Sequence, residues 1–573
     1  MENRRTMTLA ALALVAMLLL ASCKAAPATS SPTTTATTQA ATTTTTAKPA
    51  TTSAPATTTT AKPTTAPTTA APAQFGELRI AIATFGKEKF EVPLLVQTDM
   101  SLTHPMFDVM IWTEKGQFTP AVLEKWTMSP DTLSWTLNVR KGIKFHNGVE
   151  VTAADIKFSL EQYQRKDSPQ PMMRNSVERI EVVDNYTVKV TTKGPQPYFP
   201  SWLTLGSPQQ GGVMPKDYVE KNGWEYANAH PVGTGPWKFV KHNPGDSVQY
   251  EAVSSHWRAT PNFKNMTIFM IPEEFTRIAA LKTGQMEIAE SSLDSLAGLK
   301  AAGLQTPIVD QVGVGSQFHG AFDPRVAGKP ISDLRVRKAL QIAINRDEIA
   351  KNFFQGLGGP PMPIQSTSTT AEIDADYWAK YFTDMYKYNP DEARRLLKEA
   401  GAEGFTIKLY SHPIAGTPWL PQLNEIVAGY WQKVGVNAQV VPVDYGTLLT
   451  WRKPLLDQLA GQHTFMRYPS GAPAIRGLES NFGSTGTSPL LIGAPTQPQA
   501  DKLIAQVWSE IDPAKRRDLL KELITLVHDS FVGSQIGSGP STLGAAKNID
   551  LSGWSTPPAT PVFTMFAANV KHK

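Results

Sequence analysis

The sequence predicts an α/β protein, because segments with strand-like and helix-like patterns alternate along most of the chain. Apolar residues alternate over 76–84 and again over 134–140, as they do in half-buried strands. Residues 389–401 instead place apolar side chains three and four positions apart, which is typical of one buried helix face. No internal repeat is found.

The first helix is predicted to begin after Thr152. Thr152 is a suitable N-cap, and Asp155 three residues later completes a capping box. Ile156, Leu160 and Tyr163 then fall on one helix face.

A later helix has strong signals at both ends. Asn389 is a suitable N-cap, Pro390 takes the first helical position, and Gly401 ends the segment. The spacing of apolar residues predicts further helices over 420–434, 503–511 and 519–527, and a strand over 439–443.

Length and composition fit a soluble globular body with several domains. The chain has 573 residues, of which 41% are hydrophobic and 18% charged. The formal net charge is only +5, and no dense Lys/Arg face with interleaved aromatic residues is present. A nucleic-acid partner is therefore not expected.

The N-terminus is predicted to be a lipoprotein signal peptide over 1–23. Arg4 and Arg5 supply positive charge, and an apolar run over 9–20 is too short to span a bilayer. The run ends in Leu-Ala-Ser before Cys23, which resembles a bacterial lipobox with Cys23 as the lipidation site. An ordinary signal peptide with an incidental cysteine is the alternative. Cys23 is the only cysteine, so disulfides and cysteine-based metal sites are excluded.

Residues 24–74 are nearly all Thr, Ala, Pro and Ser. Such a segment lacks large apolar side chains that could offset the entropy of ordering, so a disordered tether is predicted. A semi-extended Pro-rich chain of this length reaches up to roughly 150 Å. Its threonine content also permits O-glycosylation, which stays a hypothesis.

Five segments in order resemble the signature of the family 5 (peptide/nickel-type) extracellular solute-binding proteins of bacterial ABC importers. The longest is WTLNVRKGIKFHNGVEVTAADIKFSL over 135–160. The other four are GQFTPAVLEKW over 116–126, PVGTGPWKF over 231–239, ISDLRVRKALQIAINR over 331–346, and the helix ending in Glu-Ala-Gly over 389–401. We expect their glycines, Arg335 and Arg337 to be structural.

The resemblance implies a two-lobed α/β fold of the periplasmic-binding-protein type II class, large cluster, with mixed sheets flanked by helices. The ligand would lie in a cleft between the lobes, which close about a hinge. Lobe I would comprise 75–118, 230–317 and 531–573. An extra domain would span 119–229, and lobe II would span 318–530.

No catalytic set is visible in the sequence. Nucleophile-elbow, zinc-protease, Walker and dinucleotide-binding motifs are absent, and the histidines are scattered. The glycine-rich segment 313–320 is interpreted as a crossing between the lobes. The protein is therefore not expected to be an enzyme or to hold a cofactor or a metal.

Candidate ligand residues come from loops at the lobe interface. They are Phe85 after the first strand, Phe318 and His319 at the crossing, and Met466, Arg467, Tyr468 and Asn481 in the segment 463–484. His319 is also consistent with a packing role. Peptide-binding members typically carry an Asp-Tyr-x-x-Pro-like segment there, whose Asp pairs with the ligand's amino terminus.

Arg467 stands at the corresponding place in this sequence. A cation there repels an ammonium group and attracts an anion, which favours a neutral or anionic solute over an oligopeptide. The alternative is that Arg467 points to solvent or pairs with an acid.

The resemblance implies the extracytoplasmic substrate-binding component of an ABC importer. It would be a monomer held at the membrane by its lipid alone, and would deliver a small molecule or short peptide to membrane permease subunits. The alternative is a lipid-anchored surface sensor of the same fold that is not coupled to import.

Overall fold

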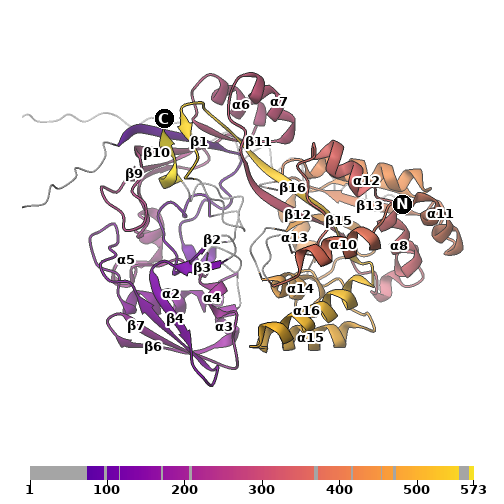
Figure 1. Ribbon diagram of the computed structural model, residues 1–573, viewed down its shortest axis with the longest axis horizontal. Coiled ribbons are helices and arrows are strands. Elements are labelled where there is room, and N and C mark those ends of the chain that lie inside the picture. Colours follow the sequence, from indigo (N-terminus) through magenta and orange to yellow (C-terminus); the bar gives the residue numbers. More distant parts are fainter. Residues whose placement is uncertain are drawn as a thin grey trace, which may run out of the picture. The chain divides into compact units, whose positions relative to one another are not determined.

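The largest element is a mixed ten-stranded sheet with the order β14-β13-β15-β12-β16-β11-β1-β10-β9-β8 (Figure 1). Its strands are β1 (Phe75–Ile82), β8 (Trp237–Asn243), β9 (Ser247–Ala252), β10 (Phe263–Met270), β11 (Ile288–Ser291), β12 (Ile308–Phe318), β13 (Thr406–Ser411), β14 (Asn437–Pro442), β15 (His463–Tyr468) and β16 (Gly533–Ala545). β1 runs parallel to β10 and β11, and β13 runs parallel to β14 and β15. The remaining pairs are antiparallel.

The computed structural model describes residues 74–95, 100–114, 117–169, 172–204, 210–364, 366, 372–414, 417–452, 454–468, 473–553 and 567–573. The compact unit of which they form part runs from Ala70 to Lys573. The predicted signal peptide, Cys23 and the tether up to residue 73 lie outside the described residues.

β12 and β16 are the two strands that join the halves of this sheet. They pair with each other from Ile308 opposite Thr542 to Gln317 opposite Gly533. β12 also pairs with β15, and β16 also pairs with β11. The predicted crossing over 313–320 therefore falls largely within β12, and any change in the angle between the halves must pass through these two strands.

A second, four-stranded sheet lies in the segment predicted as the extra domain. Its order is β4-β5-β7-β6. The elements of this segment and the short hairpin before it are β2 (Ile111–Glu114), β3 (Gln117–Pro120), β4 (Leu123–Met128), β5 (Ser134–Val139), α2 (Ala153–Tyr163), α3 (Met172–Ser176), β6 (Val177–Asp184), β7 (Thr187–Thr192), α4 (Phe199–Trp202) and α5 (Lys216–Ala229).

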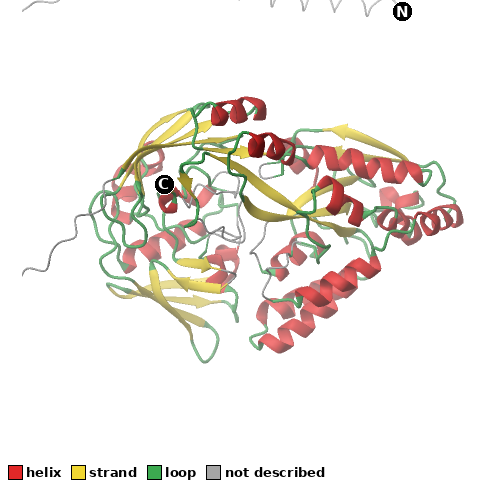
Figure 2. Ribbon diagram, turned by 45° about the horizontal axis from the view of Figure 1, so that its top comes forward, coloured by secondary structure: helices red, strands yellow, loops and turns green. Residues whose placement is uncertain are grey.

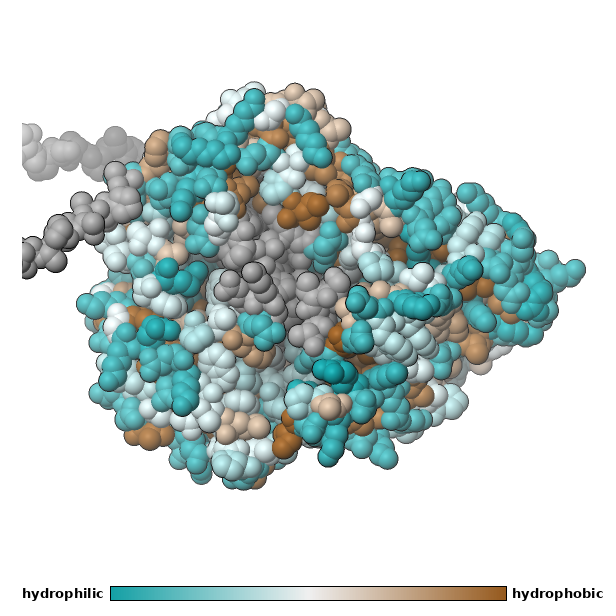
Figure 3. Space-filling model, viewed as in Figure 1, coloured by the Kyte–Doolittle hydropathy of each residue, from teal (hydrophilic) through white to brown (hydrophobic). Residues whose placement is uncertain are grey.

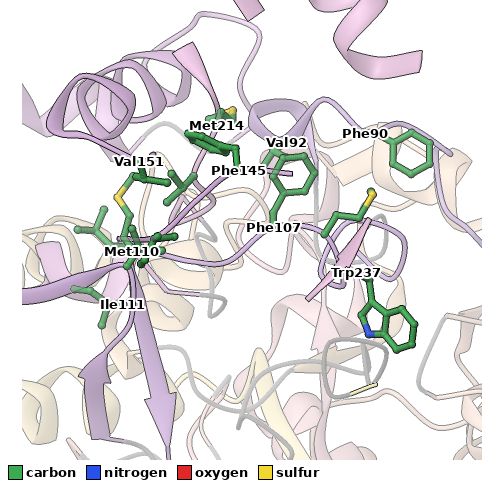
Figure 4. Close-up of a cluster of buried hydrophobic side chains, with 14 of the residues drawn as sticks. Phe90, Val92, Phe107, Met110, Ile111, Phe145, Val151, Met214 and Trp237 are labelled. Carbon is green, nitrogen blue, oxygen red and sulfur yellow. The ribbon is translucent and has the colours of Figure 1, made fainter. Parts of the chain in front are cut away.

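One continuous apolar core joins this sheet to lobe I. Phe107 and Trp237 from lobe I belong to the same buried cluster as Phe145 and Met214 from the extra domain (Figure 4). The domain boundaries remain a prediction, and the names lobe I, extra domain and lobe II are kept for the predicted ranges.

Lobe II is mainly helical and contributes most residues of two further buried clusters, which also include a few residues of lobe I and the extra domain. Its helices are α8 (Leu334–Ile342), α9 (Arg346–Glu348), α10 (Ala375–Met385), α11 (Pro390–Glu399), α12 (Leu420–Lys433), α13 (Tyr445–Arg452), α14 (Ala474–Phe482), α15 (Gln497–Ser509) and α16 (Pro513–His528). Lobe I adds α6 (Glu274–Lys282) and α7 (Leu293–Ala301). Figure 2 shows these helices in red against the yellow strands, and the face in Figure 3 is mostly hydrophilic, as expected when apolar side chains fill the cores.

The local signals in the sequence locate several elements correctly. The Thr152 backbone N–H donates to Asp155 Oδ2 at 2.9 Å, which confirms the capping box of α2. Asn389 Oδ1 accepts from the Glu392 backbone N–H at 3.0 Å at the start of α11. Gly401 has a φ of 63°, a left-handed conformation that favours glycine just after a helix.

The predicted helix over 503–511 is wrong at its C-terminal end. α15 stops at Ser509, and Ile511 is 48% exposed instead of lying on the buried face. The chain breaks here because Asp512 caps α16, its side chain accepting from the backbone N–H groups of Ala514 and Lys515, with Pro513 at the first helical position. A residue that precedes proline is biased away from helical conformation.

Candidate functional site

The carboxyl ends of three parallel strands meet at one edge of the sheet in lobe II. β13 lies between β14 and β15, and the three strands end at Ser411, Pro442 and Tyr468. In open α/β sheets, ligands bind in the crevice outside the carboxyl ends of the strands. This edge is therefore a candidate solute site.

A partly buried arginine stands at this edge. Arg452, the last residue of α13, donates from Nε to Ser488 Oγ at 3.0 Å, and its Nη1 lies 3.9 Å from Met466 Sδ. Among the described residues no carboxylate pairs with it. Burial lowers the pKa of Arg452, while nearby Tyr445 and Tyr468 act in the opposite direction.

Two histidines near Arg452 are held neutral. The ring of His412, just beyond β13, stacks on Tyr445 with centroids 5.1 Å apart. Burial, and next the charge of Arg452, lower the pKa of His412 to about 4. His319 contacts Thr464 Oγ1 at 2.8 Å, and burial and Arg452 lower its pKa well below the ordinary value. Near neutral pH the positive charge here therefore resides on Arg452.

A buried hydrogen-bonded group lies on the same face of β15. Gln317 Nε2 donates to Tyr468 Oη at 2.5 Å and to Asn481 Oδ1 at 2.7 Å. The Tyr468 ring packs so closely on β12 that a Cβ at Gly315 would lie 2.0 Å from it. This fit requires glycine at 315 and fixes the orientation of the tyrosine.

The structure brings some of the predicted residues together and separates others. Met466 and Tyr468 point to the Arg452 side of β15, and Asn481 joins Tyr468 through Gln317. Arg467 alternates to the opposite face of the strand and is 8% exposed.

The two predicted aromatic residues are buried in cores. Phe318 is fully buried, with its ring centroid 5.8 Å from that of Trp431. Phe85 is fully buried in the core that lobe I shares with the extra domain. All seven positions remain predictions as ligand contacts.

Sequence reasoning missed Arg452, His412 and Tyr445. One signal was available for the arginine: positions three and four residues away on either side are leucines, namely Leu448, Leu449, Leu455 and Leu456. An arginine with no acid at these spacings has no intrahelical partner. The two aromatic residues gave no comparable signal, because their proximity depends on how β13 and β14 are placed.

A contact between the extra domain and lobe II lies elsewhere in the molecule. Tyr198, the residue before α4, meets Trp508 of α15 edge-to-face at 5.0 Å, and the Arg516 guanidinium lies 5.0 Å above the Tyr198 ring. Burial, and next the charge of nearby Glu372, raise the pKa of the Tyr198 hydroxyl. Glu372 accepts from the Ala474 backbone N–H at 2.9 Å. We call this set the closing contact.

The described residues contain neither a candidate metal site nor a helix that could cross a membrane. No group of three or more His, Cys, Asp or Glu side chains in those ranges could hold a metal ion. Within the same ranges every helix is too short or too polar to cross a membrane.

Comparison with known families identifies the chain. The sequence model described as bacterial extracellular solute-binding proteins, family 5 Middle, matches residues 117–474, which is more than half of the chain. The chain belongs to this family. The expected family is thereby confirmed.

Individual relatives of this family 5 protein are distant. It is 26% identical over 377 residues to a dipeptide-binding protein of Escherichia coli, covering 60% of this chain and 67% of the relative. It is 28% identical over 414 residues to the glutathione-binding protein GsiB of Pectobacterium atrosepticum, covering 70% of this chain and 76% of the relative. Both relatives are binding proteins.

Solved structures share the fold of the family 5 protein. NikA from Brucella suis, in complex with Fe(III)-EDTA, has a TM-score of 0.74 at 20% identity, covering 87% of this chain and 100% of the other. The periplasmic binding protein DppA from Helicobacter pylori, in complex with the peptide STSA, has a TM-score of 0.70 at 20% identity, with 87% and 98% covered. The predicted α/β periplasmic-binding-protein fold is confirmed.

Proposed function

We propose that this family 5 protein captures a small solute between two closing lobes and delivers it to the permease of an ABC importer. Two features of the structure support the proposal: the two strands that connect the halves of the sheet, and the closing contact at a distance from them. Only β12 and β16 join the halves of the described sheet, while Tyr198 meets Trp508 away from that connection. A hinge at the strands and a contact at the far side are what closure requires.

The closing contact needs to contribute only a small free energy in favour of the closed form. An edge-to-face aromatic pair contributes about 0.5–1.5 kcal/mol, and a cation–π contact about 0.5–1 kcal/mol. A contact of this strength biases the closed form without locking it, so solute binding can decide the equilibrium. The binding step leaves the solute chemically unchanged, and we propose no enzymatic activity.

Lipid anchoring at Cys23 is part of the proposal. The single cysteine stands directly after the predicted signal peptide, and the Thr/Pro/Ala-rich tether separates it from the folded unit. The folded unit would act as a monomer and touch the membrane only through this lipid. Growth of the native host with an alkyne-tagged fatty acid should label the wild-type chain and leave a Cys23→Ser chain unlabelled. Equal labelling of both would contradict lipidation at Cys23.

Solution scattering tests the closure directly. The full Cys23→Ser chain, purified without denaturation, is compared with the same chain unfolded, washed free of solute and refolded. We expect the natively purified chain to have the smaller radius of gyration and to release its solute with unchanged mass. Identical curves with no bound solute, or a chemically altered solute, would contradict the proposal. Import is separated from sensing by uptake of that solute in cells that lack the chain.

A further inference from the structure

Three buried arginines show how this fold normally satisfies a guanidinium. Arg277 donates to three backbone carbonyl oxygens at 2.6–3.1 Å. Arg337 likewise donates to three carbonyl oxygens at 2.8–2.9 Å. Arg346 donates to four acceptors at 2.8–3.2 Å: the backbone carbonyl oxygens of Gln535 and Gln341, the side-chain Gln341 Oε1, and Ser534 Oγ. Each is therefore stabilised by oxygen acceptors within the protein.

Arg452 differs from these three. A guanidinium carries five N–H donors. In the described part of the chain, its only oxygen acceptor is Ser488 Oγ, and its other polar neighbour is the weakly accepting sulfur of Met466. A partly buried cation without a counter-ion costs free energy that an incoming anion would recover.

The surroundings of Arg452 select the kind of anion. His319 and His412 are neutral near pH 7, so the described cluster presents a single positive charge. Tyr445, Met466 and Tyr468 add aromatic and thioether surface around it. One cation in such a setting balances one negative charge, and the planar guanidinium fork matches a carboxylate in two parallel hydrogen bonds.

We propose that Arg452 binds a carboxylate of the captured solute, at the carboxyl edge of β13, β14 and β15. The assignment rests on the proposed solute-binding function and narrows its ligand to carboxylate-bearing molecules. It also moves the anion-binding role from the predicted Arg467, on the far face of β15, to a residue of α13.

The test uses acetate as the probe and does not require the natural solute. The full Cys23→Ser chain is labelled with 15N-arginine and stripped of solute, and the Nε–Hε signal that disappears in Arg452→Lys identifies Arg452. We expect acetate to shift this signal saturably. Acetamide, a neutral molecule of the same shape, should leave it in place, and the Arg346 signal should not move with either probe.

Variants complete the design. Arg452→Gln should weaken retention of the natively co-purified solute about 10- to 100-fold, the range for losing a hydrogen bond to a charged group. Arg335→Gln removes an exposed pair with Asp333 and a hydrogen bond to the Glu399 carbonyl oxygen. It is the matched control and should retain the solute fully. Unchanged thermal unfolding of both variants shows that folding is intact.

The outcomes separate the two proposals. An Arg452 signal that ignores acetate, or that responds equally to acetamide, overturns the carboxylate assignment. If scattering still shows closure in that case, the solute-binding function stands alone. A saturable acetate shift supports the assignment, and a chain that shows it without closing or retaining solute would contradict the capture mechanism.

Discussion

Arg346 and Arg452 lie in the same lobe, lack carboxylate partners among the described residues, and yet have opposite surroundings. Arg346 is 8% exposed, donates to four oxygen acceptors and lies 4.7 Å above the Tyr386 ring. Within the described ranges, Arg452 contacts one hydroxyl oxygen, Ser488 Oγ, and one sulfur, Met466 Sδ. The first arginine completes the packing of β16 against the helices. The second is the arginine that we propose binds the solute.

The largest expected effect comes from breaking the satisfied arginine. Arg346→Met removes the guanidinium donor from the Gln535 and Gln341 carbonyl oxygens and from Ser534 Oγ, while Gln341 Oε1 still accepts from Ser534 Oγ. Each buried acceptor left unsatisfied costs about 1–3 kcal/mol in the free energy of unfolding. Urea denaturation followed by tryptophan fluorescence measures it. A loss below about 1 kcal/mol would mean that Arg346 does not stabilise the packing of β16.

The next effect is a pH dependence centred on His412. Its pKa falls from the ordinary 6.5 to about 4 in the folded protein, so the unfolded chain binds more protons between these values. The contribution of neutral His412 to stability is complete above pH 6.5 and is lost as the pH falls towards 4. The full shift corresponds to about 3 kcal/mol.

Urea denaturation at pH 7 and pH 5 checks this dependence. His412→Gln should lose less stability than wild type on acidification. Arg452→Gln should lie between the two, because removing the neighbouring cation raises the pKa of His412. His104, His463 and His528, whose pKa values burial lowers to about 3, give all three proteins a shared acid sensitivity. If all three proteins lost the same free energy of unfolding between pH 7 and pH 5, His412 would not titrate as predicted and would not be coupled to Arg452.

Tyr198→Ala should act on closure and only weakly on folding. It removes the contacts to Trp508 and Arg516, which together contribute about 1–2.5 kcal/mol. Solute affinity should therefore fall about 10-fold, read by equilibrium dialysis of the co-purified solute. Tyr198→Phe keeps the ring and should bind nearly as wild type. An equal loss in both variants would assign the effect to the hydroxyl instead of the aromatic contact.

The smallest expected effect is that of Arg452→Gln on the free energy of unfolding, measured in the absence of solute. Removing an under-satisfied charge should leave the free energy of unfolding within about 1 kcal/mol of wild type, or slightly higher. The same urea measurement that tests Arg346→Met gives this value. A loss as large as that of Arg346→Met would show that Arg452 is structural.

Sequence reasoning succeeded where the signal is local. The capping box of α2 and the Asn389 cap of α11 depend on residues within three positions of each other, so the pattern contains the whole interaction. The five ordered motifs gave the family for a similar reason. Ile511 was misplaced because Asp512 and Pro513 start a new helix, and that signal competes with apolar spacing.

The residues around Arg452 could not be predicted as neighbours from the sequence, because they come from distant segments. Arg452, His412 and Tyr445 meet through the parallel pairing of β13 with β14 and β15, which no short window of sequence encodes. Arg467 attracted attention by its position in a motif. Alternation along β15 turns it away from the face that carries Met466 and Tyr468.

Native mass spectrometry of the full Cys23→Ser chain, purified without denaturation beside Arg452→Gln, tests the central claim most directly. We expect one small carboxylate-bearing solute per wild-type chain, chemically unchanged on release, and little or none on the variant. A neutral solute, or equal occupancy of the two proteins, would contradict it.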